Sequence, residues 1–393
     1  MRYTIGEMAE IIDGDRGKNY PQQHEFLDEG YCLFLNTGNV TKAGFSFDSN
    51  QFISKEKCDL LRKGKLQRHD IVYTTRGTVG NAAYYSDSIP YEHVRINSGM
   101  VIIRPKEAIV CTEFLYQILK SDYYRPFFRK HCTGSAQPQL PIKNFSTIEL
   151  DLPDLPVQCR IAGILSTYDD LIENNQKQIK LLEEAAQRLY KEWFVDLRFP
   201  GYETTPIVDG IPQGWHEGTI QDVVIYHDKK RKPLSGMQRA EMQGEYRYYG
   251  AASILDYVND YLFDGTYLLL GEDGTVVTED GFPVLQYITG KFWVNNHAHV
   301  LTGQPGYPTE YLYMMFKSTK VKDVVTGAAQ PKISQARLSN KKIIVPSKQL
   351  VSAYCDITGP MFKDIINLEH QITVLKEARD RLLPKLMSGE IEV

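Results

Sequence analysis

The stretches GSAQPQLP, which begins at Gly134, and GAAQPKIS, which begins at Gly327, decide how this chain of 393 residues is interpreted. Gln137 of the first stretch and Gln330 of the second lie 193 positions apart. The same offset relates Leu152-Pro153 to Val345-Pro346, Gln178-Ile179 to Gln371-Ile372, Glu184-Ala185 to Glu377-Ala378 and Arg188-Leu189 to Arg381-Leu382. A constant register over about 60 residues indicates two copies of one structural unit.

The segments that precede the two copies do not match in the same way. Ile5–Met8 can be aligned with Ile220–Val223, but at an offset of 215. Residues 9–133 and 224–326 differ in length and in sequence. The chain therefore alternates variable and repeated parts, which predicts two different surfaces on one repeated frame.

The repeated part predicts a long helix that packs along a single partner. In the first copy the apolar positions recur in alternating short steps, and Asn175 is the one polar position among them. These seam positions are Ile161, Leu165, Tyr168, Ile172, Ile179, Leu182 and Leu189. Such an a/d pattern is typical of a coiled coil, in which a lone Asn fixes register and orientation. Asp154 is the predicted N-cap, and a helix that reaches about Phe194 would be ~60 Å long.

The second copy carries the same stripe in a rougher form. Its seam positions are Ile365, Leu368, Ile372, Leu375 and Leu382, and Arg379 interrupts them. Gly359-Pro360 is expected to kink or restart this helix, and Pro384 is expected to end it. Because both stripes are narrow and both lie in the repeat, we predict that the two helices pack on each other rather than on separate domains.

The variable parts predict α+β domains. Short β-like runs occur at 70–74, 100–103, 267–270 and 292–294, and they alternate with helical stretches at 111–119 and 309–317. Turns at 76–80 and 271–274 follow predicted strands, where they would expose backbone N–H groups and polar side chains. Asp196–Gly214, which is rich in Pro and Gly, is the clearest linker.

Composition restricts the class of protein. A hydrophobic content of 42% and a charged content of 24% are those of a soluble globular protein, and the length favours two or three domains. We find no run of about 18 apolar residues and no basic-then-apolar start typical of a secretory signal. The six cysteines form no Cys-x-x-Cys pair, which favours a reducing cytoplasm over a disulfide frame or a zinc knuckle.

The net charge of −4 argues against a nucleic-acid binder, but the basic residues are clustered. One basic run consists of Lys229, Lys230, Arg231 and Lys232. A looser cluster contains Arg62, Lys63, Lys65 and Arg68. A third cluster is interleaved with aromatic residues and contains Arg125, Arg129, Lys130 and His131. Each cluster taken singly is more often a solvated face.

The sequence contains no recognisable catalytic motif. A phosphate-binding Gly-x-x-x-x-Gly-Lys-Ser/Thr loop, a Gly-x-Gly-x-x-Gly turn and an Asn/Asp-Pro-Pro-Tyr/Phe run are all absent. His297 and His299 would share a face if they lay on one strand, but a metal site would need further ligands to which the sequence does not point.

The whole chain resembles the specificity subunit of a Type I restriction–modification enzyme. In the first half the resemblance is carried by HDIVYTTRGTVGNAAYY (69–85), INSGMVIIRP (96–105), TGSAQPQLP (133–141) and DLPDLPVQCRIAGILSTYDDLIENNQKQI (151–179). In the second half it is carried by IPQGW (211–215), YRYYGAASILDYVNDYLFDGTYLLLGEDG (246–274), WVNNHAHVL (293–301) and LLPKLMSGEI (382–391). Gly359-Pro360 departs from the straight second helix that the family implies.

The resemblance implies a non-catalytic protein with two target-recognition domains, each a twisted, mainly antiparallel sheet with helices, joined by two antiparallel spacer helices. Each domain would read one half of a split, asymmetric site on double-stranded DNA. Half-sites one helical turn apart lie about 34 Å apart, so the helices would act as a ruler.

The implied partners are two copies of a modification (methyltransferase) subunit and the motor-nuclease restriction subunits. No cofactor is expected on this chain: S-adenosylmethionine belongs to the modification subunit, and ATP with Mg²⁺ to the restriction subunit. The expected location is the cytoplasm of a bacterium or archaeon.

The predicted boundaries are residues 1–150 for the first recognition domain, 151–197 for the first spacer helix and 198–213 for a linker. Residues 214–345 form the second recognition domain, and 346–393 form the second spacer helix and tail.

Candidate DNA contacts follow from residue type. Arg76 is a first choice because arginine pairs bidentately with guanine, and Thr75 and Thr78 flank it. The other candidates are Lys229, Lys230, Arg231, Lys232, Tyr248, Tyr249, Asn295, Asn296 and His297. Gln137 and Gln330 are expected to anchor each domain to its helix or to touch backbone phosphate.

Three alternatives remain open at this point. The chain could be the specificity subunit of another bipartite methyltransferase or restriction system, or a coiled-coil scaffold whose domains bind proteins. It could also be a DNA-modifying enzyme whose active site the motifs do not reveal.

Overall fold

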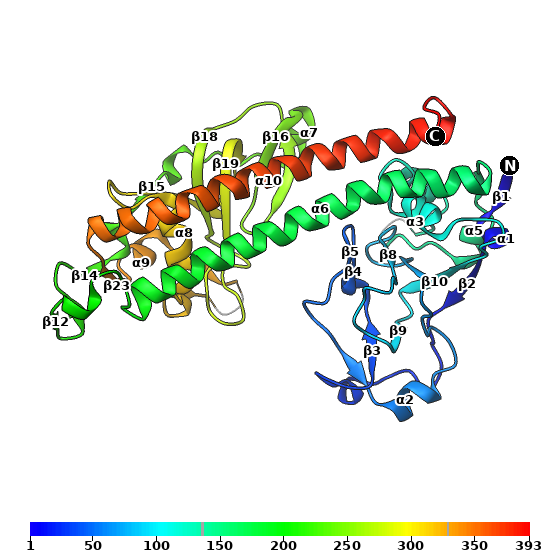
Figure 1. Ribbon diagram of the computed structural model, residues 1–393, viewed down its shortest axis with the longest axis horizontal. Coiled ribbons are helices and arrows are strands. Elements are labelled where there is room, and N and C mark those ends of the chain that lie inside the picture. The colour runs from blue at the N-terminus through cyan, green and yellow to red at the C-terminus, as the bar shows by residue number, and fades with distance from the viewer. Residues whose placement is uncertain (135–136, 328–329) are drawn as a thin grey trace. The chain divides into compact units, whose positions relative to one another are not determined.

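The computed structural model describes residues 1–134, 137–327 and 330–393. Ser135, Ala136, Ala328 and Ala329 of the repeated stretches lie outside the described residues. The chain forms two compact units (Figure 1): unit 1 comprises residues 1–173 and 372–393, and unit 2 comprises residues 174–371. The domain boundaries predicted from the sequence stay a prediction, because this division runs through both long helices rather than along their ends.

Unit 1 holds a four-stranded antiparallel sheet and a smaller three-stranded sheet. Its strands are β1 (Arg2–Thr4), β2 (Ala9–Asp13), β3 (Cys32–Leu35), β4 (Val40–Thr41), β5 (Gly44–Phe45), β6 (Phe52–Ile53), β7 (Ile71–Thr74), β8 (Ala82–Tyr84), β9 (Val94–Ile96), β10 (Met100–Pro105) and β11 (Glu149–Asp151). Its helices before the repeat are α1 (Ile5–Met8), α2 (Lys55–Leu60), α3 (Thr112–Lys120), α4 (Arg125–Arg129) and α5 (Ile142–Ser146). The sheet orders are β2-β10-β7-β8 and β6-β3-β9, and β3 runs parallel to β9.

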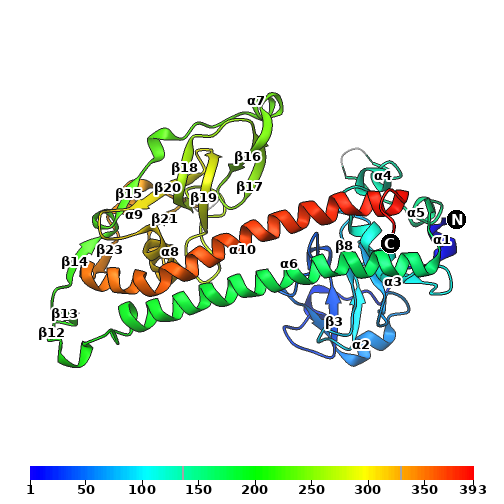
Figure 2. The same ribbon diagram turned by 45° about the horizontal axis from the view of Figure 1, so that its top comes forward.

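Helix α3 links the sheet of unit 1 to the long helices. Phe114 and Ile118 of α3 belong to the same buried core as Ile161 and Leu165 of α6 (Leu155–Tyr190). Leu383 of α10 (Lys348–Ser388) joins the same core. Figure 2 shows α3 lying beside the first half of α6.

Unit 2 is built around one six-stranded sheet. Its strands are β12 (Ile207–Val208), β13 (Ile211–Pro212), β14 (His216–Thr219), β15 (Val224–Tyr226), β16 (Gln243–Tyr249), β17 (Ile254–Val258), β18 (Phe263–Gly271), β19 (Leu285–Val294), β20 (Ala298–Gly303), β21 (Val325–Thr326), β22 (Lys332–Ile333) and β23 (Lys342–Val345). Its shorter helices are α7 (Gly236–Glu241), α8 (Thr309–Ser318) and α9 (Gln335–Ser339). The sheet order is β15-β20-β18-β19-β16-β17, and β16 runs parallel to β19.

Helix α8 occupies in unit 2 the place that α3 has in unit 1. Tyr311 of α8 packs on Tyr190 of α6 and Tyr354 of α10, with ring centroids 5.6 Å and 6.4 Å apart. Leu312 and Phe316 of α8 lie in the same core as Leu268 and Leu270 of β18. The aromatic core thus joins the helices to the sheet.

The two long helices run antiparallel, as predicted. In unit 2, Asn175 Nδ2 donates to Gln371 Oε1 (3.1 Å), and Tyr354 Oη donates to the backbone oxygen of Ala186 (2.9 Å). Asn175, the predicted polar position, therefore has its partner on the other helix. In unit 1, Asp169 accepts hydrogen bonds from Arg379 (2.8 Å) and from Lys120. After Tyr190 the chain makes one π-helical turn to Val195, close to the predicted end at Phe194.

Every predicted seam residue is buried or half-buried. The buried ones are Ile161, Leu165, Ile172, Ile365 and Ile372, and the half-buried ones are Tyr168, Ile179, Leu182, Leu189, Leu368, Leu375 and Leu382.

Two expectations about proline were wrong. Helix α10 runs from Lys348 to Ser388 as one helix, so Gly359-Pro360 does not restart it and Pro384 does not end it, while the kink at Pro360 stays a prediction. A proline inside a helix costs about 3 kcal/mol. Here Tyr354 and Phe362 are buried on either side of Pro360, and Leu383 and Leu386 flank Pro384. Burying large apolar side chains contributes about 2 kcal/mol each, which offsets that cost.

The other elements largely follow the sequence. The predicted strands and helices of both variable parts are present as β7, β10, β18, β19, α3 and α8. The predicted linker instead contains the hairpin β12–β13, whose Asp209 and Gly210 have positive φ (51° and 80°), as a tight Asp-Gly turn requires. Among the described residues, no helix combines the length and apolar character that crossing a membrane would require.

Candidate nucleic-acid interface

The basic run of unit 2 meets two turns at the end of its sheet. Arg231 Nη1 donates to the backbone oxygen of Ala298 (2.7 Å) and to Glu272 Oε2 (2.6 Å). The backbone N–H of Glu272 donates to the backbone oxygen of His297 (2.8 Å). Three segments that are distant in sequence, at 228–232, 271–274 and 295–298, are thereby joined into one surface.

A buried charge cluster joins these segments. His299 Nε2 faces the backbone oxygen of Ile333 (2.9 Å), and its Nδ1 faces Asp228 Oδ2 (2.6 Å). Because a carbonyl and an ionised carboxylate both only accept, both ring nitrogens donate and the ring carries a charge. Arg231 lies 3.4 Å from Asp228 and 2.6 Å from Glu272. The cluster therefore balances two carboxylates with two cations.

The same carboxylates and His299 have metal-ligand chemistry, with ligand atoms within 4.8 Å of one another. The sequence had not pointed to Asp228 and Glu272 as partners of His299. Because Arg231 and His299 already neutralise the carboxylates, we assign the group as an ion-pair network rather than a metal centre. His297 does not share the strand of His299: it lies in the turn before β20 and bonds Asp273 through Nδ1.

Burial alone would raise the pKa of both carboxyl groups in the network. For Asp228, the hydrogen bond and charge of His299, the backbone N–H of Val300 and the charge of Arg231 outweigh burial and lower the pKa. The pKa of Glu272 is lowered in the same way, because Arg231, His299 and Lys332 outweigh the effect of burial. Both side chains are thus held as carboxylates that fix the adjoining segments.

The predicted contacts of unit 2 divide into exposed and buried groups. Lys229, Lys230, Lys232, Asn296 and His297 are exposed, and Arg231 is half-buried in the network.

The expectation that Tyr248 and Tyr249 contact DNA is corrected, since they are 1% and 4% exposed. Tyr248 Oη accepts from the backbone N–H of Leu234 (2.9 Å). Asn295 is also buried, and its side chain accepts from the backbone N–H of His297 (2.8 Å). It therefore shapes the turn rather than reaching a base.

Unit 1 builds the corresponding surface around Arg76. The backbone N–H of Thr75 donates to the oxygen of Gly99 (2.9 Å), and that of Leu140 donates to the oxygen of Thr75 (2.9 Å). Thr75 is buried and bonds Gly99 through its hydroxyl, so its expected DNA contact is also corrected. Arg76 is half-exposed and Thr78 is exposed.

The two units use the same hydrogen bonds at matching places. We name Thr75–Gly77 and Glu272–Gly274 the strand-end turns, because they follow β7 and β18. Leu140 and Ile333 lie 193 positions apart, and their N–H groups donate to the first residue of these turns (2.9 Å and 2.8 Å). The last residues, Gly77 and Gly274, both have positive φ (69° and 85°).

A second pair of turns matches as closely. We name Asn97–Gly99 and Asn295–His297 the asparagine turns. In each, the Asn side chain accepts from the backbone N–H two residues later, at 2.9 Å in unit 1 and 2.8 Å in unit 2. The variable parts therefore share one local architecture that their sequences do not reveal.

Arg16 is another residue that the sequence analysis missed. It donates to the backbone oxygen of Ser98 (3.3 Å) and pairs with Asp13 (3.1 Å). Arg231 likewise donates to the oxygen of Asn296 (3.4 Å) and pairs with Asp228. Asp13 and Arg16 lie 215 positions before Asp228 and Arg231, which is the offset that relates Ile5–Met8 to Ile220–Val223. Extending that alignment would have found them.

Gln137 and Gln330 are both exposed. This exposure argues against an anchoring role for their side chains and leaves phosphate contact as the prediction. Ser135, Ala136, Ala328 and Ala329, which complete these stretches, lie outside the described residues.

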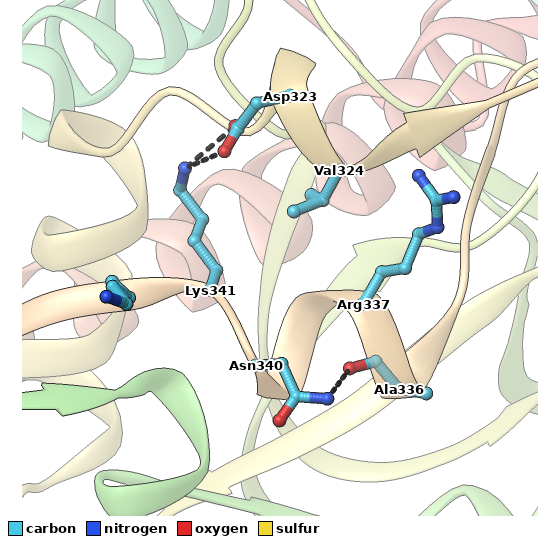
Figure 3. Close-up of a pocket in the computed structure, with 7 residues that line it drawn as sticks. Asp323, Val324, Ala336, Arg337, Asn340 and Lys341 are labelled. Atoms are coloured by element: carbon cyan, nitrogen blue, oxygen red, sulfur yellow. Dashed lines mark hydrogen bonds and ion pairs between the residues drawn. The ribbon is translucent and has the colours of Figure 1, made fainter.

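One cavity of unit 2 lies elsewhere (Figure 3). It measures about 550 Å³ and is lined by Asp323, Val324, Ala336, Arg337, Asn340, Lys341 and Lys342. Lys341 pairs with Asp323 across it (2.7 Å), and none of the candidate contacts lines it. The turns, and not this cavity, therefore hold the candidate contacts predicted from the sequence.

Comparisons with known proteins extend over nearly the whole chain. Residues 1–184 and 212–373 match the family described as the Type I restriction modification DNA specificity domain. The chain is 28% identical to the Type I restriction enzyme MjaIX specificity subunit of Methanocaldococcus jannaschii, over 82% of this chain and 78% of that protein. It is 21% identical to the HindI specificity subunit of Haemophilus influenzae, over 98% of this chain and 100% of that protein.

A solved structure shares the fold. The Type-I restriction-modification system S subunit from M. genitalium matches with a TM-score of 0.52 at 16% identity, over 98% of this chain and 95% of that chain.

Proposed function

The chain belongs to the family of Type I restriction modification DNA specificity proteins, and on that premise we propose that it directs a multisubunit enzyme to a split DNA target. Each unit reads one half of an asymmetric site. The observation that carries this proposal is the pair of matching turn surfaces, built twice with the same hydrogen bonds but different side chains. Two unlike readers on one repeated frame suit an asymmetric target, as a symmetric dimer suits a palindrome.

Affinity and specificity are expected to come from different groups. Exposed Lys229, Lys230 and Lys232 suit phosphate contacts, which supply affinity that is independent of sequence. Replacing all three by Ala should lower the slope of log affinity against log salt by up to about 2.7, because each lost phosphate contact contributes about 0.9. The target sequence should stay the same.

Chemistry belongs to the partners in this proposal. Two copies of a modification subunit bind S-adenosylmethionine and methylate adenine, and restriction subunits with ATP and Mg²⁺ complete the nuclease. This chain binds neither cofactor. Helix α6 has 36 residues, about 54 Å, so lengthening α6 and α10 together should change the gap between half-sites.

The test is to sequence DNA methylation in a host without its own methylases that expresses this chain with its modification subunit. Methyladenine at a split asymmetric motif, present only when this chain is present, supports the proposal. Methylation that appears without the chain contradicts it.

A further inference from the structure

We propose that the strand-end and asparagine turns carry the specificity-determining side chains: Arg76 in unit 1, and His297 held by Asp273 in unit 2. The inference rests on the proposed function and names the residues that set one base position in each half-site.

The matching backbone bonds show which residues correspond. Thr75 corresponds to Glu272, because each donates its N–H across to the asparagine turn and accepts from the repeated segment (Leu140 or Ile333). Arg76 then corresponds to Asp273, and their bridge partners, Gln139 and Lys332, lie 193 positions apart in the repeat. By the same alignment Gly99 corresponds to His297. The backbone is thus constant, while the side chains that it presents differ.

Only one side of each strand-end turn is available to DNA. The first residue faces inward in both units, since Thr75 is buried and Glu272 is held by Arg231 at 2.6 Å. The second residue is partly exposed in both units, and Asp273 bonds His297 of the asparagine turn. This leaves Arg76 in unit 1 and the Asp273–His297 pair in unit 2 as the groups of these turns that can reach DNA.

Arg76 is prepared to read a base. Its backbone N–H is bonded to Gly99 (3.1 Å), which fixes the main chain, and its guanidinium has no ion pair or hydrogen bond within the described parts of the chain. A half-exposed arginine of this kind pairs bidentately with O6 and N7 of guanine in the major groove. Unit 1 therefore requires a guanine at one position of its half-site.

His297 offers the opposite chemistry. Its Nδ1 bonds the Asp273 carboxylate, which places a proton on Nδ1 and leaves Nε2 of the exposed ring as the atom that can accept a hydrogen bond from DNA. Asn295 holds the backbone of the same residue. An outward acceptor matches the exocyclic amino group of adenine or cytosine. Asp273 is a positioning residue, because it acts through the ring.

The experiment is methylation sequencing of the complex with Arg76→Lys, which keeps the charge but loses the bidentate fork. We expect one guanine of one half-site to become tolerant of other bases, with discrimination falling about 5- to 150-fold. The matched control, Lys18→Ala, removes an exposed cation of the same unit and should leave the motif unchanged. A motif that Arg76→Lys leaves unchanged overturns the inference.

The unit 2 arm uses His297→Ala, Asp273→Ala and the double variant. We expect all three to relax the same single position of the other half-site, with the double variant no worse than His297→Ala. Lys229→Ala is the control. The acceptor role of His297 is contradicted if the position that relaxes is one where the unaltered chain selects guanine. It is also contradicted if the three variants relax different positions.

If a variant abolishes methylation, binding of the purified complex to DNAs altered at each position decides the matter. Loss confined to one position supports the inference, and uniform loss overturns it. Failure of the proposed function can be told apart from failure of this inference. If the proposed function is wrong, the unaltered chain itself will direct no methylation to a specific motif.

Discussion

Unit 1 and unit 2 support the same turns by different means. In unit 1 the Asp13–Arg16 pair is open to solvent, with side chains 26% and 46% exposed. In unit 2 the Asp228–Arg231 pair is 10% and 13% exposed and is joined by Glu272 and His299. The turns themselves are the same, so the geometry does not depend on the charge network.

The strand neighbours explain the difference. Val101 pairs with Tyr73 in unit 1 at the place where His299 pairs with Leu270 in unit 2. Val101 and Tyr73 are both buried, so unit 1 fills this place with apolar side chains. In unit 2 the buried charge of His299 needs partners there, which the carboxylates of Asp228 and Glu272 supply. The same arrangement of turns is therefore supported by apolar side chains in unit 1 and by an ion-pair network in unit 2.

The largest difference between the two units is expected in the free energy of unfolding when the aspartate of each Asp–Arg pair is removed. Asp228→Ala leaves Glu272 as the one carboxylate of the network facing Arg231 and His299, so one buried positive charge is uncompensated. We expect a loss of about 3–5 kcal/mol in the free energy of unfolding. Asp13→Ala breaks an exposed pair and should cost about 0–1 kcal/mol. Denaturant unfolding of the full chain measures both, and similar losses would contradict the comparison.

Acid should reveal the same contrast. The pKa values of Asp228 and Glu272 are lowered in the folded chain, so they stabilise it above their unfolded values near 4. This stabilisation is lost as the pH falls through the lowered folded pKa values. Thermal unfolding between pH 6 and pH 2.5 should show a steep acid decline that is shallower in Asp228→Asn. Identical pH profiles would exclude the network as the cause.

The paired glycines of the repeat allow a smaller comparison. Gly134 and Gly327 have φ of 84° and 83°. An added Cβ would lie 2.9 Å from the oxygen of Gln137 and 2.4 Å from that of Gln330. We expect Gly→Ala at either site to cost about 1–3 kcal/mol, with Gly327→Ala the worse. Gly163 in α6 has open space, so Gly163→Ala should stabilise by about 0.5–1 kcal/mol in the same melting experiment.

The smallest effect is expected at Gln137 and Gln330. Because both side chains are exposed, Gln→Ala at either position should change the free energy of unfolding by less than about 0.5 kcal/mol. A loss well above that in a melting experiment would restore the anchoring role. Weaker DNA binding at all sequences, with unchanged stability, would support phosphate contact.

The amino-acid sequence determined the frame of this protein. The offset of 193 and the heptad spacing are patterns along one chain, so they predicted the repeat, the helix pair and the polar role of Asn175. Prolines at 360 and 384 misled the same analysis, because a local cost was outweighed by packing on both sides.

The candidate interfaces were decided only by the tertiary structure. Arg231, Glu272 and His297 come together through pairings of β15, β18 and β20, and no local pattern marks those pairings. Tyr248 had the residue type of a DNA contact, but the sheet buries it. Residue type indicates what a side chain can bind, whereas long-range strand pairing decides whether it reaches solvent. That is why the two variable parts, different in sequence, present their candidate readers from the same turns.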